Sequence, residues 1–175
     1  MLIRTMKETE INEFLGQASL GRIACEFEGQ PYISDAYFAA ERGFLYSFST
    51  VGQKIRWMRA NPRVCVQFEE IRSPQEWATV IVQGVYEELT KTPEHEMQRT
   101  RAYTLLQKRA MWWEPAAARS DHVEGAVEPV YFRIRMGCTT GRCGVLEEHQ
   151  VTRENWLRRI FHGPPREIDK GISRR

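Results

Sequence analysis

The sequence predicts a mainly β fold of the α+β class, an antiparallel barrel, closed or nearly closed, with helices at its periphery. Six short runs rich in aromatic and β-branched residues alternate with turn segments, and helical stripes lie between some of them. A barrel follows because closure removes the exposed edges of such a sheet. The composition, 42% hydrophobic and 27% charged, is typical of a globular chain and excludes a disordered one.

Each expected strand is a run that suits a half-buried or buried position in a sheet. Gly-containing segments of hairpin size separate the first three runs, which predicts an antiparallel meander. The fifth run is long, and Gly84 marks a bend within it. In chain order the six expected strands are 20–27, 31–40, 43–49, 63–71, 76–89 and 130–136.

Three segments carry the spacing of amphipathic helices. Residues 7–17 place Ile11, Phe14 and Leu15 on one stripe. Residues 93–109 begin with a proline in the first turn. The apolar face expected for that helix consists of Met97, Ala102, Leu105 and Leu106.

The third helix follows Ser49, where Thr50 and Gln53 match a capping box. Ile55 and Met58 supply its apolar face, and the Asn61–Pro62 pair ends it.

Charge divides the chain into two parts, although 25 Lys+Arg against 23 Asp+Glu leave a net charge of only +2. Residues 151–175 hold seven basic and three acidic residues, a local excess of +4. We therefore expect a single domain over 1–150 and a basic C-terminal tail over 151–175. The balanced total argues against nucleic acid as a partner.

The sequence offers no membrane or metal signal. No apolar run approaches the roughly 20 residues that span a bilayer, and the first ten residues lack the apolar region of a secretory signal, so we expect a cytoplasmic protein. The spacing of the four histidines and of Cys25, Cys65, Cys138 and Cys143 does not match a metal site, and the last two cysteines flank an expected glycine-rich turn.

The segment 45–54, LYSFSTVGQK, is the most informative for chemistry. A strand leads into a Gly-containing turn that opens a helix, and the first turn of a helix attracts anions such as phosphate. Ser49 and Thr50 add hydroxyl donors, and Lys54 adds a positive charge. Taken alone, the pattern fits an ordinary capped helix with a solvated lysine equally well.

The order of the motifs is more specific than any one of them. Over roughly three-quarters of its length the chain resembles the pyridoxamine 5′-phosphate oxidase-like flavoproteins, which are FMN-binding split barrels. The closest branch is the small one that includes the nitroimidazole-resistance proteins. The matching segments are LGRIA at 20–24, QPYIS at 30–34, GFLYSFSTVGQK at 43–54, RANPRV at 59–64, WATVIVQG at 77–84, YFRIR at 131–135 and TGR at 140–142.

This resemblance implies a six-stranded antiparallel split β-barrel that works as a homodimer, with the flavin held between subunits. Residues 1–150 then form the flavin-binding domain, and FMN is the expected cofactor. The residues that the resemblance assigns to the cofactor are Gln53 and Lys54 with Ser49 and Thr50 at the phosphate, Ser47, Phe48 and Ser49 along the ribityl chain and ring, Ser34, Asp35 and Ala36 at the ring edge, and Thr79 at the phosphate or ring.

Trp113, in the unusual pair Trp112–Trp113, has two interpretations that the sequence leaves open. One is a lid over the outer face of the flavin, and the other is a loop fastened onto the barrel.

Departures from the family pattern bear on function. Ser47 replaces a histidine that is common in the nitroimidazole-resistance branch, and nothing after Gly144 reproduces the segment that grips the vitamin substrate. We therefore do not expect pyridoxamine phosphate oxidation. Gln53 stands where an arginine is common, which removes one charge from the phosphate site and favours either a larger flavin, FAD, or a looser hold.

The leading hypothesis is an FMN-dependent oxidoreductase that passes electrons from a reduced nicotinamide cofactor to a small organic acceptor. The sequence identifies no catalytic acid or base. A non-catalytic flavin-binding carrier or sensor is the main alternative, and a haem protein on the same fold is a third hypothesis.

Overall fold

The computed structural model describes residues 2–108, 129–145 and 153–162. Within them, eight antiparallel strands form one sheet in the order β3-β2-β6-β7-β8-β5-β4, with β1 paired to β8. The strands are β1 (Leu2–Thr5), β2 (Leu20–Phe27), β3 (Gln30–Tyr37), β4 (Ala39–Glu41), β5 (Phe44–Ser49), β6 (Arg63–Ser73), β7 (Glu76–Glu88) and β8 (Val130–Val145). The helices are α1 (Glu8–Gln17), α2 (Gln53–Ala60), α3 (Glu96–Gln107) and α5 (Arg153–His162), and a short 3₁₀ helix, η1 (Pro93–His95), precedes α3.

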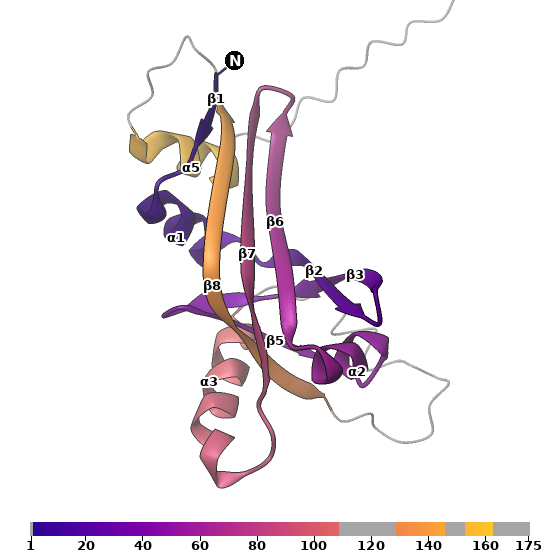
Figure 1. Cartoon of the computed structure of the whole chain (residues 1–175). Helices are drawn as coiled ribbons and strands as arrows, with labels where there is room; N and C mark the ends of the chain where they lie inside the picture. The colour runs from indigo at the N-terminus through magenta and orange to yellow at the C-terminus, as the bar shows by residue number, and fades with distance from the viewer. Residues whose placement is uncertain (1, 109–128, 146–152, 163–175) are drawn as a thin grey trace, which may run out of the picture.

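The sheet curls into a split barrel, as the sequence predicts. β3 and β5 lie near opposite ends of the strand order, yet the two strands contact each other. In the described part of the chain β3 pairs only with β2, so this seam of the barrel carries no strand ladder. In Figure 1 the long strands β6, β7 and β8 run side by side, and β2, β3 and β5 cross their lower half.

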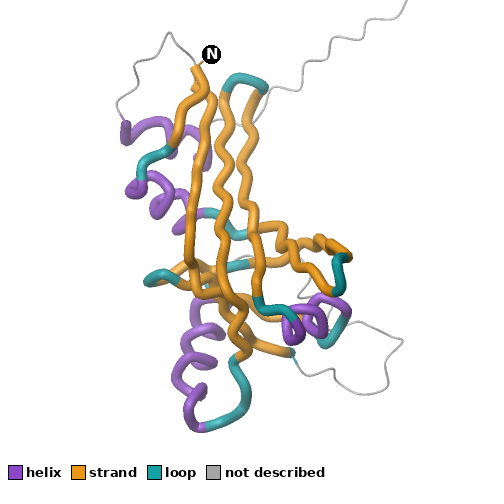
Figure 2. Tube along the Cα trace, viewed as in Figure 1, coloured by secondary structure: helices purple, strands orange, loops and turns teal. Residues whose placement is uncertain are grey.

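The strand faces alternate as a barrel requires. Val64, Val66 and Phe68 of β6 point into the main core, and the residues between them point outward. Helices cover the barrel from outside, with α1 and α5 beside the upper strands and α3 at the opposite end (Figure 2). A second, smaller cluster of buried residues forms where α3 packs on the barrel: Ala39, Tyr46, Leu89, Ala102 and Leu106.

Eight strands replace the six that the sequence predicts. The additional strand β1 has only four residues, and the run expected over 31–40 divides into β3 and β4 at Phe38, whose backbone N–H donates to the carbonyl of Ser19 at 2.7 Å. The bend at Gly84 is confirmed, because the β7–β8 register shifts between Val82 and Gly84.

The turn expected between Cys138 and Cys143 is wrong, because β8 continues through both residues to Val145. Gly141 lies inside this strand and lets α1 and its lead-in approach closely. A Cβ atom there would lie 2.8 Å from Sδ of Met6.

The helices lie where the periodicity places them, with two corrections. Met97 is 77% exposed, so the buried face of α3 is carried by Ala102 and Leu106 instead. Gly52 is the N-cap of α2 and no side chain caps this helix, so the capping box of Thr50 and Gln53 is wrong. None of the helices in the described residues is long and apolar enough to cross a membrane.

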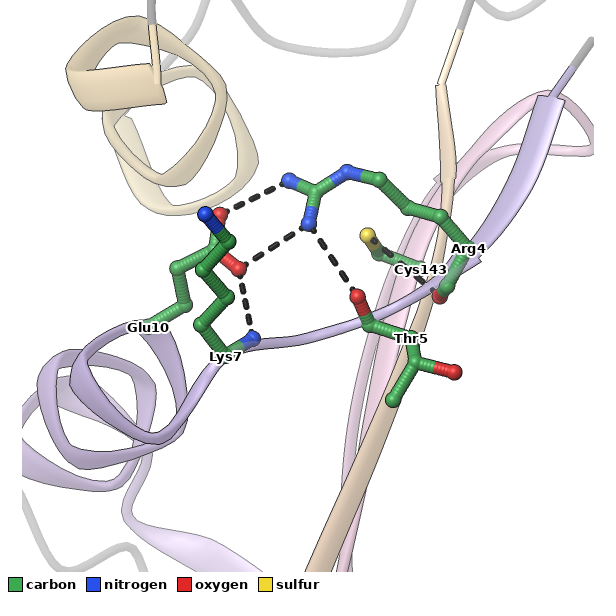
Figure 3. A network of polar contacts seen from close by, with 5 residues as sticks. All are labelled: Arg4, Thr5, Lys7, Glu10 and Cys143. Carbon is green, nitrogen blue, oxygen red and sulfur yellow. Dashed lines mark hydrogen bonds and ion pairs between the residues drawn. The ribbon is translucent and has the colours of Figure 1, made fainter.

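The N-terminal segment is fastened to the barrel by a polar network (Figure 3). The carboxylate of Glu10, only 4% exposed, accepts hydrogen bonds from the Arg4 guanidinium at 2.9 and 2.8 Å and from the backbone N–H of Lys7 at 2.8 Å. The Cys143 thiol donates to the carbonyl of Arg4. The network therefore joins β1 to both α1 and β8.

The basic tail contains one described element, the amphipathic helix α5. Leu157 and Ile160 are buried in the main core, and the ring of Phe161 lies 5.2 Å from that of Phe14. This part of the tail is therefore packed on the domain, in contact with α1.

Candidate functional site

Helix α2 is held against the barrel by its apolar face. Ile55 and Met58 are fully buried in the main core. Trp57 packs its ring against Phe27 and Tyr32 at the β2–β3 hairpin, with ring centroids 6.1 and 5.7 Å apart. These contacts fix the helix so that its first turn, which contains Gln53 and Lys54, lies beside β3.

Lys54 is the charged residue of this turn that faces β3, whereas Arg56 is exposed. Its Nζ donates a long hydrogen bond of 3.4 Å to the backbone carbonyl of Asp35. Burial lowers the pKa of the Lys54 ammonium, while the nearby Cys25 and Asp35 act in the opposite direction. Burial also raises the pKa of the Cys25 thiol, partly offset by Lys54. A cation that has lost water and holds one long hydrogen bond within the described part of the chain favours binding an anion.

The split seam of the barrel lies next to this lysine. Among the described residues β4 pairs with β5 only over Phe44–Tyr46, so the backbone of residues 47–49 has a described strand partner on the β8 side alone. β3 likewise pairs on one side only in the described residues, and the two strands contact each other. Backbone N–H and C=O groups at such edges suit a flat ligand with polar groups along its rim.

Two serine hydroxyls at this seam lack partners. The Oγ atoms of Ser34 on β3 and Ser47 on β5 are buried and have no hydrogen-bond partner among the described residues. Strand alternation places Ser34 on the same inward face as Ala36, and Ser47 on the same face as Leu45. A buried hydroxyl without a partner costs about 1–3 kcal/mol, so both positions fit a ligand that supplies a hydrogen bond.

The residues of β5 that are expected to contact the flavin lie on two different faces of the strand. The ring of Phe48 packs 5.8 Å from that of Tyr131 in the second cluster, on the opposite face from Ser47. Only the backbone of Phe48 therefore lies at the seam. Ser49 ends β5 and Thr50 lies in the short connection to α2, where the side chain of Gln53 is exposed.

Thr79 lies far from the lysine within one chain. It is on the outward face of β7, opposite Glu69, and its Oγ1 donates to the carbonyl of Phe68 at 3.3 Å. Cys25 of β2 is the residue near Lys54, and the part of β6 beside Cys25 is five residues away from Glu69. Five residues span about 17 Å along a strand. Trp113 lies outside the described residues.

Sequence reasoning missed a polar network that fastens the far end of α2. Arg59 in the last turn of the helix pairs with Glu88 of β7, which also accepts a hydrogen bond from Tyr86. Nothing in the spacing of these residues indicates the pair, because β6 and most of β7 lie between the two partners in the sequence. In the described part of the chain, His, Cys, Asp and Glu side chains form no group of three or more that could hold a metal ion.

Comparison with known proteins decides the family. The sequence profile described as pyridoxamine 5′-phosphate oxidase matches residues 7–143. The chain belongs to the pyridoxamine 5′-phosphate oxidase family. This profile includes α1, all of α2 and the seam strands, whereas α5 lies outside it.

Two relatives share more than a third of their aligned sequence with this chain. An uncharacterized protein of Rhizobium meliloti (strain 1021) is 37% identical over 150 residues, which cover 85% of this chain and 99% of that protein. A crystal structure of an FAD-binding protein from Mesorhizobium loti is 41% identical, covers 82% of this chain and 99% of its own, and superposes with a TM-score of 0.70.

A candidate 5-nitroimidazole antibiotic resistance protein from Bacteroides thetaiotaomicron is 18% identical and shares the fold, with a TM-score of 0.58 over 82% of this chain and 89% of that one. The resemblance to this oxidase family and its nitroimidazole-resistance branch is thus confirmed at the level of fold.

Proposed function

We propose that this chain is a flavin-binding oxidoreductase that passes electrons from a reduced nicotinamide cofactor to a small organic acceptor. The flavin supplies the redox chemistry, and the residues of this chain bind and orient it. The cytoplasm as the place of action is part of the same proposal.

The observation that carries the proposal is the grouping of three different features at one seam. Lys54 is a partly desolvated cation at the uncapped start of α2. Ser34 and Ser47 are buried hydroxyls without partners in the described chain. Two strand edges lie between them. A flavin nucleotide has a phosphate for the lysine and a flat ring whose rim both donates and accepts hydrogen bonds.

We further propose that the flavin is FAD rather than FMN. The terminal phosphate of FMN carries between one and a half and two negative charges near pH 7, as phosphate monoesters do. Each phosphate of a pyrophosphate diester carries only one. Here Lys54 is accompanied by a neutral Gln53, and the Asp35 carboxylate lies within electrostatic range of the lysine. The 41%-identical Mesorhizobium loti protein is described as FAD-binding, which agrees with this choice.

A homodimer is the proposed assembly. Thr79 faces outward and lies far from Lys54 of its own chain, so a flavin held by that lysine would meet the Thr79 of a second copy. The outward sheet face also exposes large apolar side chains, among them Leu20, Ile33 and Ile81. Size-exclusion chromatography with light scattering tests the assembly, and Ile81→Glu should shift a dimer towards monomer.

The proposed cofactor is tested with the purified full chain. Absorption bands near those of oxidised flavin are expected, or a binding shift on addition of FAD or FMN. Lys54→Ala should weaken FAD and FMN binding by about tenfold or more, since it removes a charge-assisted hydrogen bond, and should leave riboflavin binding unchanged. Unchanged FAD and FMN affinities in Lys54→Ala would reject the phosphate assignment, and a Soret band would favour haem instead.

Rapid mixing with NADH or NADPH tests the enzymatic part. An oxidoreductase of the proposed kind loses its flavin absorbance on a catalytic time scale and regains it when an acceptor is added. A flavin that stays oxidised with both donors would favour the carrier or sensor alternative.

A further inference from the structure

The C-terminal end of α2, opposite Lys54, carries a polar network that is not part of the proposed flavin site. The Arg59 guanidinium makes two hydrogen bonds to the Glu88 carboxylate, Nε to Oε2 and Nη2 to Oε1, both at 2.7 Å. Tyr86 Oη donates a third bond to the same carboxylate at 2.8 Å. Parallel, charge-assisted bonds of this kind define the direction of both partners more strictly than a single contact does.

The barrel end of this network is rigid. Tyr86 is buried in the main core, and its ring packs 5.3 Å from that of Phe132. Its backbone N–H donates to the carbonyl of Pro62, just after α2, at 2.8 Å. Glu88 is therefore held by a core residue on one side while it holds the helix through Arg59 on the other.

In the residues that the structure describes, the opposite end of the helix has no comparable polar network. Gly52 is the N-cap and offers no side chain, and the Nζ of Lys54 is held by one 3.4 Å hydrogen bond. Arg59 follows Lys54 by five residues, a rise of about 7.5 Å along a helix, so the arginine does not share the same anion. The network can affect the anion only through the placement of the helix.

We propose that Arg59, Glu88 and Tyr86 are positioning residues that set the orientation of α2 and thereby the phosphate affinity of Lys54. This inference rests on the proposed flavin function and goes beyond it, since the three residues lie at the opposite end of α2 from Lys54. Loss of the network allows the short helix to rotate about its apolar contacts, which moves the lysine and the first-turn N–H groups away from the phosphate.

The chain contains a matched control for a purely stabilising ion pair. Arg101 of α3 and Glu41 of β4 form a second two-bond pair, in which the carboxylate is 22% exposed and the arginine 45% exposed. The corresponding values for Glu88 and Arg59 are 22% and 44%. Glu41→Gln therefore removes an equivalent contact from a different helix.

The test compares FMN with riboflavin, which differ only in the phosphate, on the full chain after removal of any bound flavin. The ratio of the riboflavin to the FMN dissociation constant measures the phosphate preference. Glu88→Gln and Arg59→Gln should each lower this ratio about fivefold, and the double variant should lower it no further. Glu41→Gln should leave the ratio unchanged, and in a Lys54→Ala background Glu88→Gln should have no effect on it.

An unchanged ratio in Glu88→Gln, or an equal loss in Glu41→Gln, overturns the inference, because the network then acts on stability alone. If wild type prefers FMN and loses that preference in Lys54→Ala, the proposed function stands even when the network has no effect. If wild type binds FAD, FMN and riboflavin with equal affinity, both fail. Should Glu88→Gln not fold, Tyr86→Phe removes one of the three bonds and keeps the ring packing, with an expected decrease of about twofold.

Discussion

Ser47 allows the cofactor hypothesis to be tested by measurements of stability and binding, with no measurement of redox activity. Its side chain is fully buried, and its Oγ has no partner among the described residues. Such a hydroxyl costs about 1–3 kcal/mol, whereas removing one oxygen leaves a space smaller than a methyl group, worth less than about 1 kcal/mol. Ser47→Ala should therefore stabilise the flavin-free protein by about 1 kcal/mol, equivalent to a rise in Tm of about 2–4 °C at this chain length.

The same change should weaken flavin binding. If the hydroxyl is satisfied by the ligand, its loss removes one neutral hydrogen bond, worth about 1 kcal/mol or a factor of about five in the dissociation constant. Denaturant unfolding of the flavin-free protein and a flavin titration measure the two effects.

Ser73→Ala is the control for the Ser47 experiment, because the Ser73 hydroxyl already accepts hydrogen bonds from the N–H groups of Gln75 and Glu76. It should destabilise the protein and leave flavin affinity unchanged. The reasoning is refuted if Ser47→Ala lowers the free energy of unfolding, or if flavin binds Ser47→Ala as tightly as wild type.

The remaining predictions concern one nearly buried ion pair and two partly exposed ones. Glu10→Gln removes the charge that faces Arg4 in a nearly buried network and should lower the free energy of unfolding by about 2 kcal/mol, whereas the exposed Glu13→Gln on the same helix should change it little. Hydrogen bonds from Arg101 and Arg59 hold the pKa values of the Glu41 and Glu88 carboxyls below the usual range. Their stabilisation is present above the unfolded pKa near 4.5 and is lost as the pH falls through the folded values, so the denaturation midpoint should drop below about pH 4.5. A Glu41→Gln/Glu88→Gln double variant should show a shallower drop, and an equally steep one would assign the acid sensitivity to other carboxyls.

Much of the fold is predictable from the sequence because its signals are local. Residue alternation and glycine punctuation locate the core strands, and the apolar stripe of Ile11, Phe14 and Leu15 locates α1. The errors arise where a distant contact decides the local structure. Gly141 reads as part of a turn, but it lies inside β8, where it pairs with Val80 of β7 and leaves room for Met6.

The candidate site is predictable in part for the same reason. Lys54 lies at a helix start, and a strand-to-helix segment indicates this locally. Which face Phe48 presents depends on strand register, and the distance between Thr79 and Lys54 depends on the course of β6 and β7. The network of Arg59, Glu88 and Tyr86 has no local signal at all, since its geometry exists only after the barrel has formed.

The seam is the part of the described structure where three separate costs in free energy coincide. Lys54 has lost water, Ser34 and Ser47 have lost hydrogen-bond partners, and two strand edges have backbone groups outside any ladder. Selection for stability alone would remove the lysine and serine costs by simple substitutions, such as serine to alanine. A single ligand with an anionic end and a flat, polar-rimmed body relieves all three together. Their coincidence therefore argues for such a ligand more strongly than any of the residues does alone.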